Sequence, residues 1–384
     1  MSVKEYKITS YVSTKVEEAI RCVSLINSEF LDEALLNTLQ YVFDILGHKC
    51  ILFIKYDNRL FEVLIRPNKF PDRYRKFVPK TMKNKQNIRL LAGCILKEWA
   101  NKKDDTPTYT TKVFQTMLKD GYKIKDGCYL ITPTDAVVLK KDYSDPFVDL
   151  VGSSSYPLPL KSHKFIPFLS MNTKKEYSDI PIFTFDDWDF ISKGTINFSK
   201  VNNNWDKKKP IAVFRGMSTG CGWDAKTNMR LKAVEMSLTN PELIDAKLVG
   251  ITERYFKVHK TLRAGKVSNK YKVHPTIKQE QYSDYKYILQ IDGNVAAYRL
   301  ATTMNFGSVP LIVESDFSLW YQHLLKPYVH YIPIKHDLSN LLEVIDWCRL
   351  NDDKCEVIAQ NSKKLAEKIL TKSFLFNYLE SVMK

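Results

Sequence analysis

Residues 285–337 read YKYILQIDGNVAAYRLATTMNFGSVPLIVESDFSLWYQHLLKPYVHYIPIKHD, in which apolar runs alternate with turn residues. Tyr287–Ile291 is short, apolar and rich in aromatic and β-branched types, which predicts a buried strand. Val295–Met304 predicts a helix that ends near Gly307, and Val309–Glu314 predicts a second buried strand. Together they form a strand–helix–strand unit, the repeating element of a parallel α/β sheet.

The loop between this strand and this helix has the features of an anion site. Asp292-Gly293-Asn294 is a turn, and its glycine allows a ligand to approach the backbone closely. The helix start offers unpaired N–H groups and a positive dipole end, and Arg299 lies about one turn into the helix. A forked guanidinium there suits a diphosphate. The alternative is an ordinary packing unit whose arginine pairs with a surface carboxylate.

A second strand–loop–helix unit precedes the first. Ile211–Phe214 predicts a buried strand that ends in Arg215, and Asn228–Leu238 predicts a helix that carries Arg230. The loop between them, residues 217–223, is rich in small, hydroxylated and glycine residues, which lets backbone N–H groups face a ligand. In open α/β sheets the carboxyl ends of the strands are where ligands bind. Two units with arginines at the same edge therefore favour an anion site.

The remaining elements are predicted from periodicity and turn residues. Residues 1–150 are expected to form an α+β N-terminal domain without a chemical motif. Its expected elements are two helices within 14–46, the hairpin Cys50–Tyr56 and Arg59–Ile65, helices Ile88–Trp99 and Val113–Leu118, and strands Tyr129–Thr132 and Ala136–Leu139. Further along, the pattern predicts strand Tyr328–Lys335, helix Leu338–Arg349 and a final helix Cys355–Leu370.

Ile180–Phe190 is expected to be a strand that runs into a group of carboxylates. Asp186, Asp187 and Asp189 surround Trp188 there. Carboxylates beside an aromatic ring can hydrogen-bond sugar hydroxyls while the ring stacks on the sugar. The alternative is a strand end with solvated aspartates and a tryptophan in the core.

Composition limits the function classes. The chain has 384 residues and a net charge of +15, so its surface attracts anions. The lysines are scattered without an RNA-binding aromatic signature, which disfavours nucleic acid. The seven cysteines are widely spaced, with no disulfide framework or zinc motif.

No signal-peptide core or run of about 18 apolar residues occurs, so we expect a cytoplasmic protein without a transmembrane segment. The Lys- and Asn-rich composition fits an AT-rich genome such as that of a large DNA virus or an intracellular microbe.

Five stretches, in order, resemble one enzyme family. They are EYSDIPIFTFDDW (176–188), FRG with the small residues after it (214–219), R-x6-S-x2-NPELIDA (230–246), YKYILQIDGNVAAYR (285–299) and LKPYVHYIPIKHDLSNL (325–341). The chain from about 155 to 380 therefore resembles the capsule-associated, lipopolysaccharide-modifying glycosyltransferases, a family that includes protein O-glucosyltransferases and O-xylosyltransferases.

The resemblance implies an α/β, two-lobed glycosyltransferase of the GT-B type, with two facing Rossmann-like domains and an N-terminal extension. Residues 151–384 would form the transferase domain, with the donor lobe at about 205–350. Such enzymes are expected to invert the sugar carbon and to need no metal or other cofactor. They use a UDP-sugar, usually of glucose or xylose, and a hydroxyl of a protein or glycan acceptor.

The motif positions also assign residues. Those expected to bind the donor are Arg215, Ser218, Thr219, Arg230, Val295, Ala296, Ala297, Tyr298 and Arg299. Met217 stands where the family often has serine, so Ser218 is a neighbouring substitute. Asp187 and Trp188 would border the sugar and the acceptor.

The catalytic base is where the chain departs from the family. The family places an aspartate just before a Tyr-Pro pair, but in this sequence Ser155 precedes Tyr156-Pro157. An unassisted serine has too high a pKa to take the acceptor proton. Either a shifted alignment brings in Asp149 or Asp145, or the acceptor is activated differently, or the chain is a degenerate relative that only binds nucleotide sugars or glycans. Asp149 is the base we predict.

Overall fold

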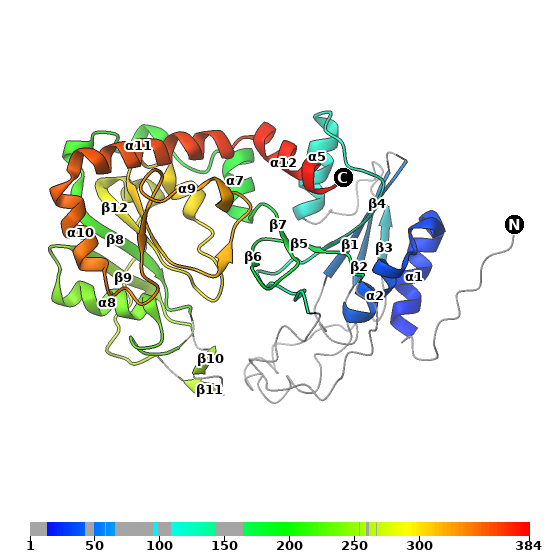
Figure 1. Cartoon of the computed structure of the whole chain (residues 1–384), viewed down its shortest axis with the longest axis horizontal. Coiled ribbons are helices and arrows are strands. Elements are labelled where there is room, and N and C mark those ends of the chain that lie inside the picture. The colour runs from blue at the N-terminus through cyan, green and yellow to red at the C-terminus, as the bar shows by residue number, and fades with distance from the viewer. Residues whose placement is uncertain are drawn as a thin grey trace, which may run out of the picture. The chain divides into compact units, whose positions relative to one another are not determined.

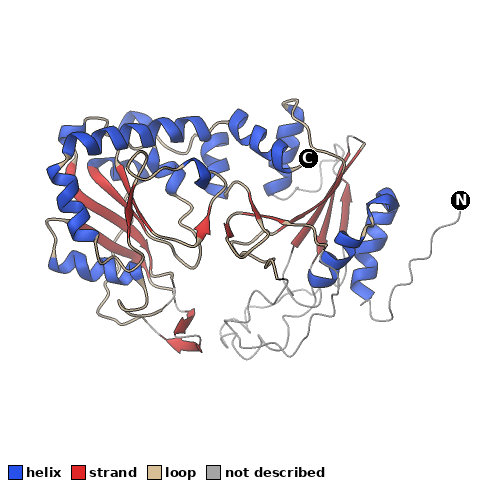
Figure 2. Cartoon of the chain, in the orientation of Figure 1, coloured by secondary structure: helices blue, strands red, loops and turns tan. Residues whose placement is uncertain are grey.

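The chain divides into two compact units in a computed structural model. The structure describes residues 14–42, 50–57, 59–65, 95–98, 109–142, 164–220, 222–252, 254–258, 261–265 and 267–384. Unit 1 comprises residues 1–170, 176–180 and 380–384, and unit 2 comprises residues 171–175 and 181–379. Figure 1 labels the elements and Figure 2 separates helices from strands.

Unit 2 is built on a five-stranded sheet in the order β15-β13-β12-β8-β9, in which all neighbours are parallel. In chain order the strands are β8 (Lys209–Met217), β9 (Ile244–Gly250), β12 (Tyr285–Gln290), β13 (Val309–Val313) and β15 (Ile332–Ile334). After β8 the chain adds β9 next to one edge of β8. It then crosses over and adds β12 next to the other edge of β8, so the direction of strand addition reverses there. The crevice between the carboxyl ends of β8 and β12 is thus the switch point of a doubly wound sheet.

Each face of this sheet carries its own core. Helices α8 (Met229–Thr239), α10 (Leu341–Leu350) and the start of α11 (Asp352–Ile369) pack on the face that presents residues such as Phe214 and Leu289. The opposite face presents Val213 and Ile288, which pack against Tyr282 and Phe306. This second face lies beside the short helix α9 (Leu300–Met304) and the 3-10 turn η5 (Gln279–Asp284). Figure 1 shows the long helix α11 running along the same unit.

The smaller elements of unit 2 complete it. They are α7 (Phe185–Lys193), α12 (Lys372–Val382, which ends in unit 1), the hairpin β10 (Arg254–Val258) and β11 (Thr261–Gly265), and the short pair β6 (Thr173–Lys174) and β14 (Phe317–Ser318).

Unit 1 contains a mixed sheet in the order β3-β2-β1-β4-β5-β7. Its strands are β1 (Cys50–Tyr56), β2 (Arg59–Ile65), β3 (Ile95–Glu98), β4 (Gly127–Ile131), β5 (Phe168–Ser170) and β7 (Ile180–Pro181). Helices α1 (Thr14–Asn27), α2 (Glu33–Tyr41) and α5 (Tyr109–Lys119) are its described helices. The hairpin β1–β2 is where the sequence predicts it, and β1 also pairs antiparallel with β4.

The prediction of two Rossmann-like domains is met by unit 2 and not by the described strands of unit 1. Among those strands the pairs β1–β2, β1–β4 and β2–β3 are antiparallel, and only β4–β5 is recorded as parallel. The chain as a whole is α/β, with the parallel sheet confined to unit 2.

Two predictions in unit 1 were wrong. A helix was expected over Ile88–Trp99, but Ile95–Glu98 forms strand β3. These residues pair with the edge of β2, and the backbone hydrogen bonds available there outweigh the helical spacing of the apolar residues. Ala136–Leu139 is not a strand. The buried carboxylate of Asp179 accepts from the backbone N–H groups of Val138 and Leu139, so a side chain takes the place of a neighbouring strand.

The apolar strand expected to run from Ile180 up to Asp186 is shorter than predicted. Only Ile180–Pro181 is a strand, and the aspartates lie in helix α7. Thr184 caps this helix, because its hydroxyl accepts from Asp187 N while the Asp187 carboxylate accepts from Thr184 N. This Thr-x-x-Asp capping box was readable from the sequence.

The helix expected over Val295–Met304 is shorter than predicted. It begins at Leu300, because Asp292 Oδ1 accepts from Ala297 N at 2.9 Å and keeps the preceding residues out of the helix. A single helical turn gives little dipole, so the anion argument from its N-terminus was wrong. The expected strand Tyr328–Lys335 contracts to β15, and α12 follows the helix we expected to be last.

Candidate functional site

A cavity of about 390 Å³ lies in unit 2 at the switch point between β8 and β12. Side chains from separate elements line it: Arg215 from β8, Arg230 from α8, and Arg299 beside α9. Thr276–Gln279 and Tyr282 close another side of it. We call this cavity the arginine pocket. It brings together three arginines that are up to 84 residues apart in the chain.

Arg230 is held by backbone carbonyls at the strand ends. Its Nε donates to Asp292 O at 2.9 Å and its Nη2 donates to Ile291 O at 3.0 Å. Its Nη1 donates to Met217 O at 3.1 Å and to Thr219 Oγ1 at 2.6 Å. The side chain is 7% exposed, so four hydrogen bonds fix a buried cation where the loops after β8 and β12 meet.

Arg299 is held less completely. Its Nη1 donates to the backbone oxygen of Arg215 at 2.5 Å and to Tyr282 Oη at 3.2 Å. Its Nε and Nη2 donate to none of the residues that the structure describes. The unused N–H groups of Arg299 are thus available to a ligand in the arginine pocket.

Both guanidinium groups lie over one aromatic ring. The Cζ atoms of Arg230 and Arg299 are 5.7 and 5.6 Å from the ring centroid of Phe214. A Cβ at position 216 would stand 2.7 Å from the Phe214 ring and 3.2 Å from Arg299 Nη2, so Gly216 leaves the room that this stack needs. The ring supports two like charges side by side through cation–π attraction.

Gly293, in the loop after β12, makes room for Thr219 and Arg230. A Cβ at position 293 would lie 2.8 Å from Thr219 Oγ1 and 3.1 Å from Arg230 Nη2. Gly293 therefore allows close approach between two protein loops.

The pair Arg230 and Arg299 adds positive charge to the wall of the arginine pocket. Neither forms an ion pair with a carboxylate of the described chain. Burial and the neighbouring charge of Arg299 lower the pKa of Arg230 to about 10, so Arg230 remains cationic at neutral pH. Asp186 also lines the pocket. Partial desolvation raises its pKa, although its surface stays exposed, and the charge of Arg299 opposes this shift. Such a site attracts an anion.

Arg215 is placed differently from the other two arginines. Its Nη2 lies 2.6 Å from Asp245 Oδ2, and its Nη1 donates to the backbone oxygens of Phe214 and Asp245. Burial acts to raise the pKa of Asp245, but hydrogen bonds from Arg215 and Tyr285 outweigh it and bring the pKa to about 2. The Arg215 guanidinium is thus neutralised, and its backbone oxygen positions Arg299.

The other expected donor residues occupy several positions. Thr219 orients Arg230, whereas Ser218 is buried and its hydroxyl accepts from Thr252 N. Val295 lies in the Asp292–Arg299 turns, and Ala296 and Ala297 line a different cavity. The hydroxyl of Tyr298 accepts from Asn172 Nδ2 at 2.6 Å.

Asp187 and Trp188 are buried, and neither lines the arginine pocket or the cavity beside Ala296 and Ala297. Asp187 Oδ2 accepts from Trp320 Nε1 at 3.0 Å, and Trp188 packs on Phe376 with ring centroids 5.8 Å apart.

Asp149 and Ser155 lie outside the described residues, so the base stays a prediction. The assignment of site residues by motif left out Asp186, Phe214 and Tyr282. A sequence signal for Asp186 was present in the Thr184-x-x-Asp187 capping box. The box turns the Asp187 side chain toward the helix N-terminus and leaves the neighbouring Asp186 exposed.

Fold and site together define an α/β protein with an arginine-lined pocket at the switch point of a parallel sheet, the place where such sheets bind ligands. The sequence profile described as "Glycosyl transferase family 90" matches residues 150–384. The chain therefore belongs to glycosyl transferase family 90.

Three relatives illustrate the similarity. Uncharacterized protein 179R of Invertebrate iridescent virus 6 is 32% identical over 367 residues, which cover 80% of this chain and 30% of that protein. Human Protein O-glucosyltransferase 3 is 32% identical over 181 residues, which cover 47% of this chain and 32% of that protein. Protein O-glucosyltransferase 2 of Danio rerio is 28% identical over 298 residues, which cover 72% of this chain and 54% of that protein.

The chain spans about a third of the length of the first two relatives. A solved structure, Anabaena HepE with UDP and glucose, matches 50% of this chain and 52% of its own at 12% identity and a TM-score of 0.31, too low to bear on the fold. Within the described part of the chain, all helices are too short or too polar to cross a membrane.

Proposed function

We propose that the chain is a glycosyltransferase that moves a sugar from a UDP-sugar to a hydroxyl of a protein or glycan. The observation that carries this proposal is the cationic pair Arg230 and Arg299, which stacks on Phe214 at the switch point with no carboxylate partner among the described residues. A diphosphate supplies the two negative charges that this pair lacks, and guanidinium forks match phosphate oxygens. Unit 2 would then be the donor lobe of a two-lobed, GT-B type enzyme.

The arginines would serve the leaving group. As the acceptor oxygen attacks the anomeric carbon, the bond from that carbon to the diphosphate oxygen breaks, and the nucleoside diphosphate leaves with the electron pair. Fixed N–H donors of Arg299 would stabilise the charge that develops on the diphosphate. A single displacement of this kind inverts the sugar carbon, because the acceptor attacks from the face opposite the leaving group. The two cations would take the role that a metal ion would otherwise have at the diphosphate. The acceptor proton would pass to a carboxylate, for which Asp149 stays our prediction.

The relatives named protein O-glucosyltransferases support glucose as the donor sugar and a protein hydroxyl as the acceptor. The second candidate is a degenerate relative that binds nucleotide sugars without transferring them, which Ser155 favours. An assay that follows both transfer and donor hydrolysis separates the two. Turnover that is lost in Asp149→Asn but retained in Ser155→Ala supports the transferase and its base, whereas the absence of any turnover supports the binding protein.

Calorimetric titration with UDP and UDP-glucose tests the donor site. We expect Arg299→Ala to weaken UDP binding by about 10- to 100-fold, since a charged hydrogen bond contributes about 1.5–3 kcal/mol. The matched control is Arg59→Ala, because Arg59 also lies over a phenylalanine ring, Phe61 at 5.0 Å, but in unit 1. Equal UDP affinities in Arg299→Ala and the parent chain would contradict the proposal.

A further inference from the structure

A cavity of about 780 Å³ lies in unit 2 beside β9, the edge strand of the parallel sheet. It is lined by residues of β8, α8, β9 and the segment 270–274, and none of its described lining residues recurs in the arginine pocket. The arginine pocket lies at the carboxyl ends of β8 and β12, whereas this cavity adjoins Lys209 and Tyr285, the first residues of those strands. We call it the β9 groove.

The floor of the β9 groove is aliphatic. Val234, Ile244 and Ala246 are buried there, and Leu238, near the C-terminal end of α8, is 75% exposed. Pockets that take ligands measure about 300–1,000 Å³ and are mostly apolar, so the groove has a suitable size and surface. An exposed leucine that continues a buried aliphatic floor offers apolar surface for a ligand to cover.

Lysine side chains surround this floor. The charged groups of the lining are four lysines and two carboxylates, namely Lys209, Lys247, Lys270, Lys272, Glu235 and Asp245. Both carboxylates are already paired, Glu235 with Lys270 at 2.6 Å and Asp245 with Arg215 at 2.6 Å. The exposed Lys209 and Lys272 form no ion pair with a carboxylate of the described residues. The groove therefore carries a net positive charge that complements an acidic ligand.

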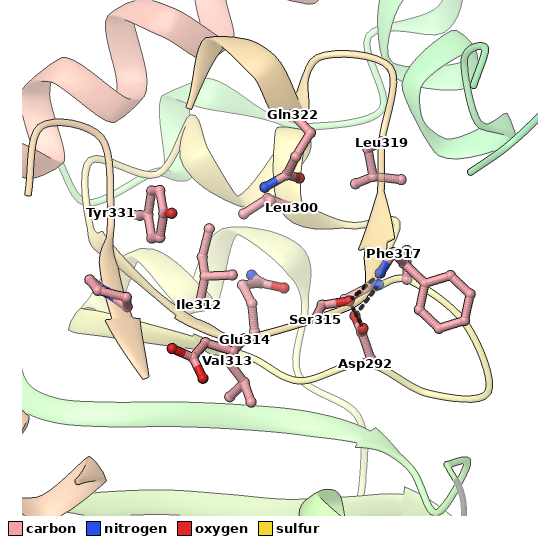
Figure 3. A pocket seen from close by; sticks show the side chains of 14 residues that line it. Asp292, Leu300, Ile312, Val313, Glu314, Ser315, Phe317, Leu319, Gln322 and Tyr331 are labelled. Carbon is pink, nitrogen blue, oxygen red and sulfur yellow. Dashed lines mark hydrogen bonds between the residues drawn. The ribbon is translucent and has the colours of Figure 1, made fainter. Parts of the chain in front are cut away.

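A smaller cavity of the same unit has the opposite charge. Figure 3 shows the cavity beside Ala296 and Ala297, about 210 Å³, where Asp292 and Glu314 are the charged residues of the lining. An acidic ligand would be repelled there. The β9 groove, in contrast, combines an aliphatic floor with lysines.

The backbone of β9 is closed to an added strand along most of the groove. The Ser237 hydroxyl accepts from Ala246 N at 3.0 Å and donates to Ile244 O at 2.8 Å. Further along, His274 N donates to Leu248 O at 2.8 Å. Recognition at this groove would thus depend on side chains.

The surface of the groove distinguishes between classes of acidic ligand. Tyr271 is only 4% exposed, and Lys209 Nζ lies 5.2 Å from the ring centroid of Tyr285, so neither ring offers an open face. Single-stranded nucleic acid depends on stacking against such faces. A hydrocarbon chain fits poorly, because paired carboxylates interrupt the aliphatic surface. A peptide supplies aliphatic groups and carboxylates side by side.

We propose that the β9 groove docks an acidic peptide segment of a partner protein. Aliphatic side chains of the segment would cover Leu238 and the floor, and carboxylates on either side of them would pair with Lys209 and Lys272. This surface is separate from the proposed UDP site, so the inference holds whether or not the chain transfers a sugar.

The test begins with a random peptide library displayed on phage and selected on the full chain. We expect the selected peptides to share carboxylates that flank aliphatic residues. One selected peptide, labelled with fluorescein, is then titrated by fluorescence polarisation, and its affinity should fall as the salt concentration rises. Arg299→Ala should bind this peptide as the parent chain does, because the arginine pocket shares no described lining residue with the groove.

Charge reversal tests the lysines. The double variant Lys209→Glu with Lys272→Glu should weaken peptide binding about 10-fold, since two attractions become repulsions at an exposed surface. The matched control is Lys335→Glu with Lys364→Glu, which changes the net charge equally at exposed positions outside the groove. This control should retain most of the affinity.

A second variant tests the aliphatic floor. Leu238→Ser should weaken binding about 3- to 10-fold by removing apolar contact. Its matched control is Leu350→Ser, because Leu350 is 86% exposed outside the groove, and this control should bind as the parent does. Both leucines are exposed, so unfolding midpoints should stay close to that of the parent chain.

The proposal is overturned if the library yields no saturable binder or only basic peptides, or if the groove variants bind as their controls do. Loss of binding in Arg299→Ala would place the peptide in the arginine pocket instead. Displacement of the peptide by equal concentrations of single-stranded DNA or oleate would assign the groove to nucleic acid or to an anionic lipid, and would overturn the proposal too.

Discussion

Asp187 is a buried acid whose ionisation opposes folding. Burial raises its pKa to about 6, against the hydrogen bonds from Thr184 and Trp320. Since its folded pKa lies above the ordinary value of 3.8, the folded state binds more protons between those two values. The stability that this group contributes is complete below about pH 4 and is lost as pH rises to about 6, a change of about 3 kcal/mol.

The variant Asp187→Asn tests this pH dependence. Its amide oxygen can keep both bonds of Oδ2, and its NH2 group replaces Oδ1, which has no partner among the described residues. Urea unfolding between pH 4 and 6, followed by the fluorescence of tryptophans in unit 2, should show a weaker fall in stability in the variant. A slope equal to that of the parent chain would mean that another group, such as Asp179 in unit 1, controls this range.

Asp186 directly precedes Asp187 in the chain. We expect it to affect the binding of UDP and not the stability of the fold. It lines the arginine pocket and its charge acts on Arg299. Removing a negative charge from the wall of an anion site should tighten UDP binding, and an exposed carboxylate contributes no more than about 1 kcal/mol. We expect Asp186→Asn to raise UDP affinity about 2- to 5-fold in a calorimetric titration, with unchanged unfolding midpoints. Weaker binding would show that Asp186 supports the ligand directly.

At the scale of elements, the loops after β8 and β12 work as one unit because Gly293 lets them touch. An added Cβ there would meet Thr219 Oγ1 at 2.8 Å and push the hydroxyl that holds Arg230. We therefore expect Gly293→Ala to weaken UDP binding about 10-fold while the circular dichroism spectrum stays that of the parent. Calorimetric titration measures the loss.

A double-variant cycle shows whether this contact is the cause. Thr219→Ala removes the hydroxyl that clashes, so in the Gly293→Ala background it should cost little further affinity. Fully additive losses would assign the effect of Gly293→Ala to the turn itself.

The sequence predicts those elements whose signals are local. Strands β8, β12 and β13 and helix α8 follow from apolar runs and flanking turn residues, and they suffice to place arginines at one sheet edge. The failures have two causes. Asp292 shortens α9 through a local side-chain bond to Ala297 N, which competes with the helix. A distant partner, the edge of β2, turns Ile95–Glu98 into a strand. Sequence alone also does not show that Asp245 neutralises Arg215, because those residues meet across adjacent strands.

At the scale of the whole molecule, each unit has its own core. Unit 1 buries Leu35, Leu52 and Leu130 in one cluster, and the cores of unit 2 lie on the two faces of its parallel sheet. The arginine pocket lies entirely in unit 2. A ligand that binds only the folded state stabilises by RT ln(1 + [L]/Kd), about 2.7 kcal/mol at one hundred times Kd. UDP should therefore stabilise unit 2 selectively.

Hydrogen exchange followed by mass spectrometry measures this prediction in the intact chain. With saturating UDP, we expect exchange to slow in peptides from β8, β12 and α9, and to stay unchanged in β1 and β2, because only the first group adjoins the pocket. Arg299→Ala at the same UDP concentration provides the control, since its weaker UDP binding should reduce the protection of β8, β12 and α9. Equal protection in both units would show that they unfold as one cooperative body, and protection of β1 and β2 alone would place the UDP site outside the arginine pocket.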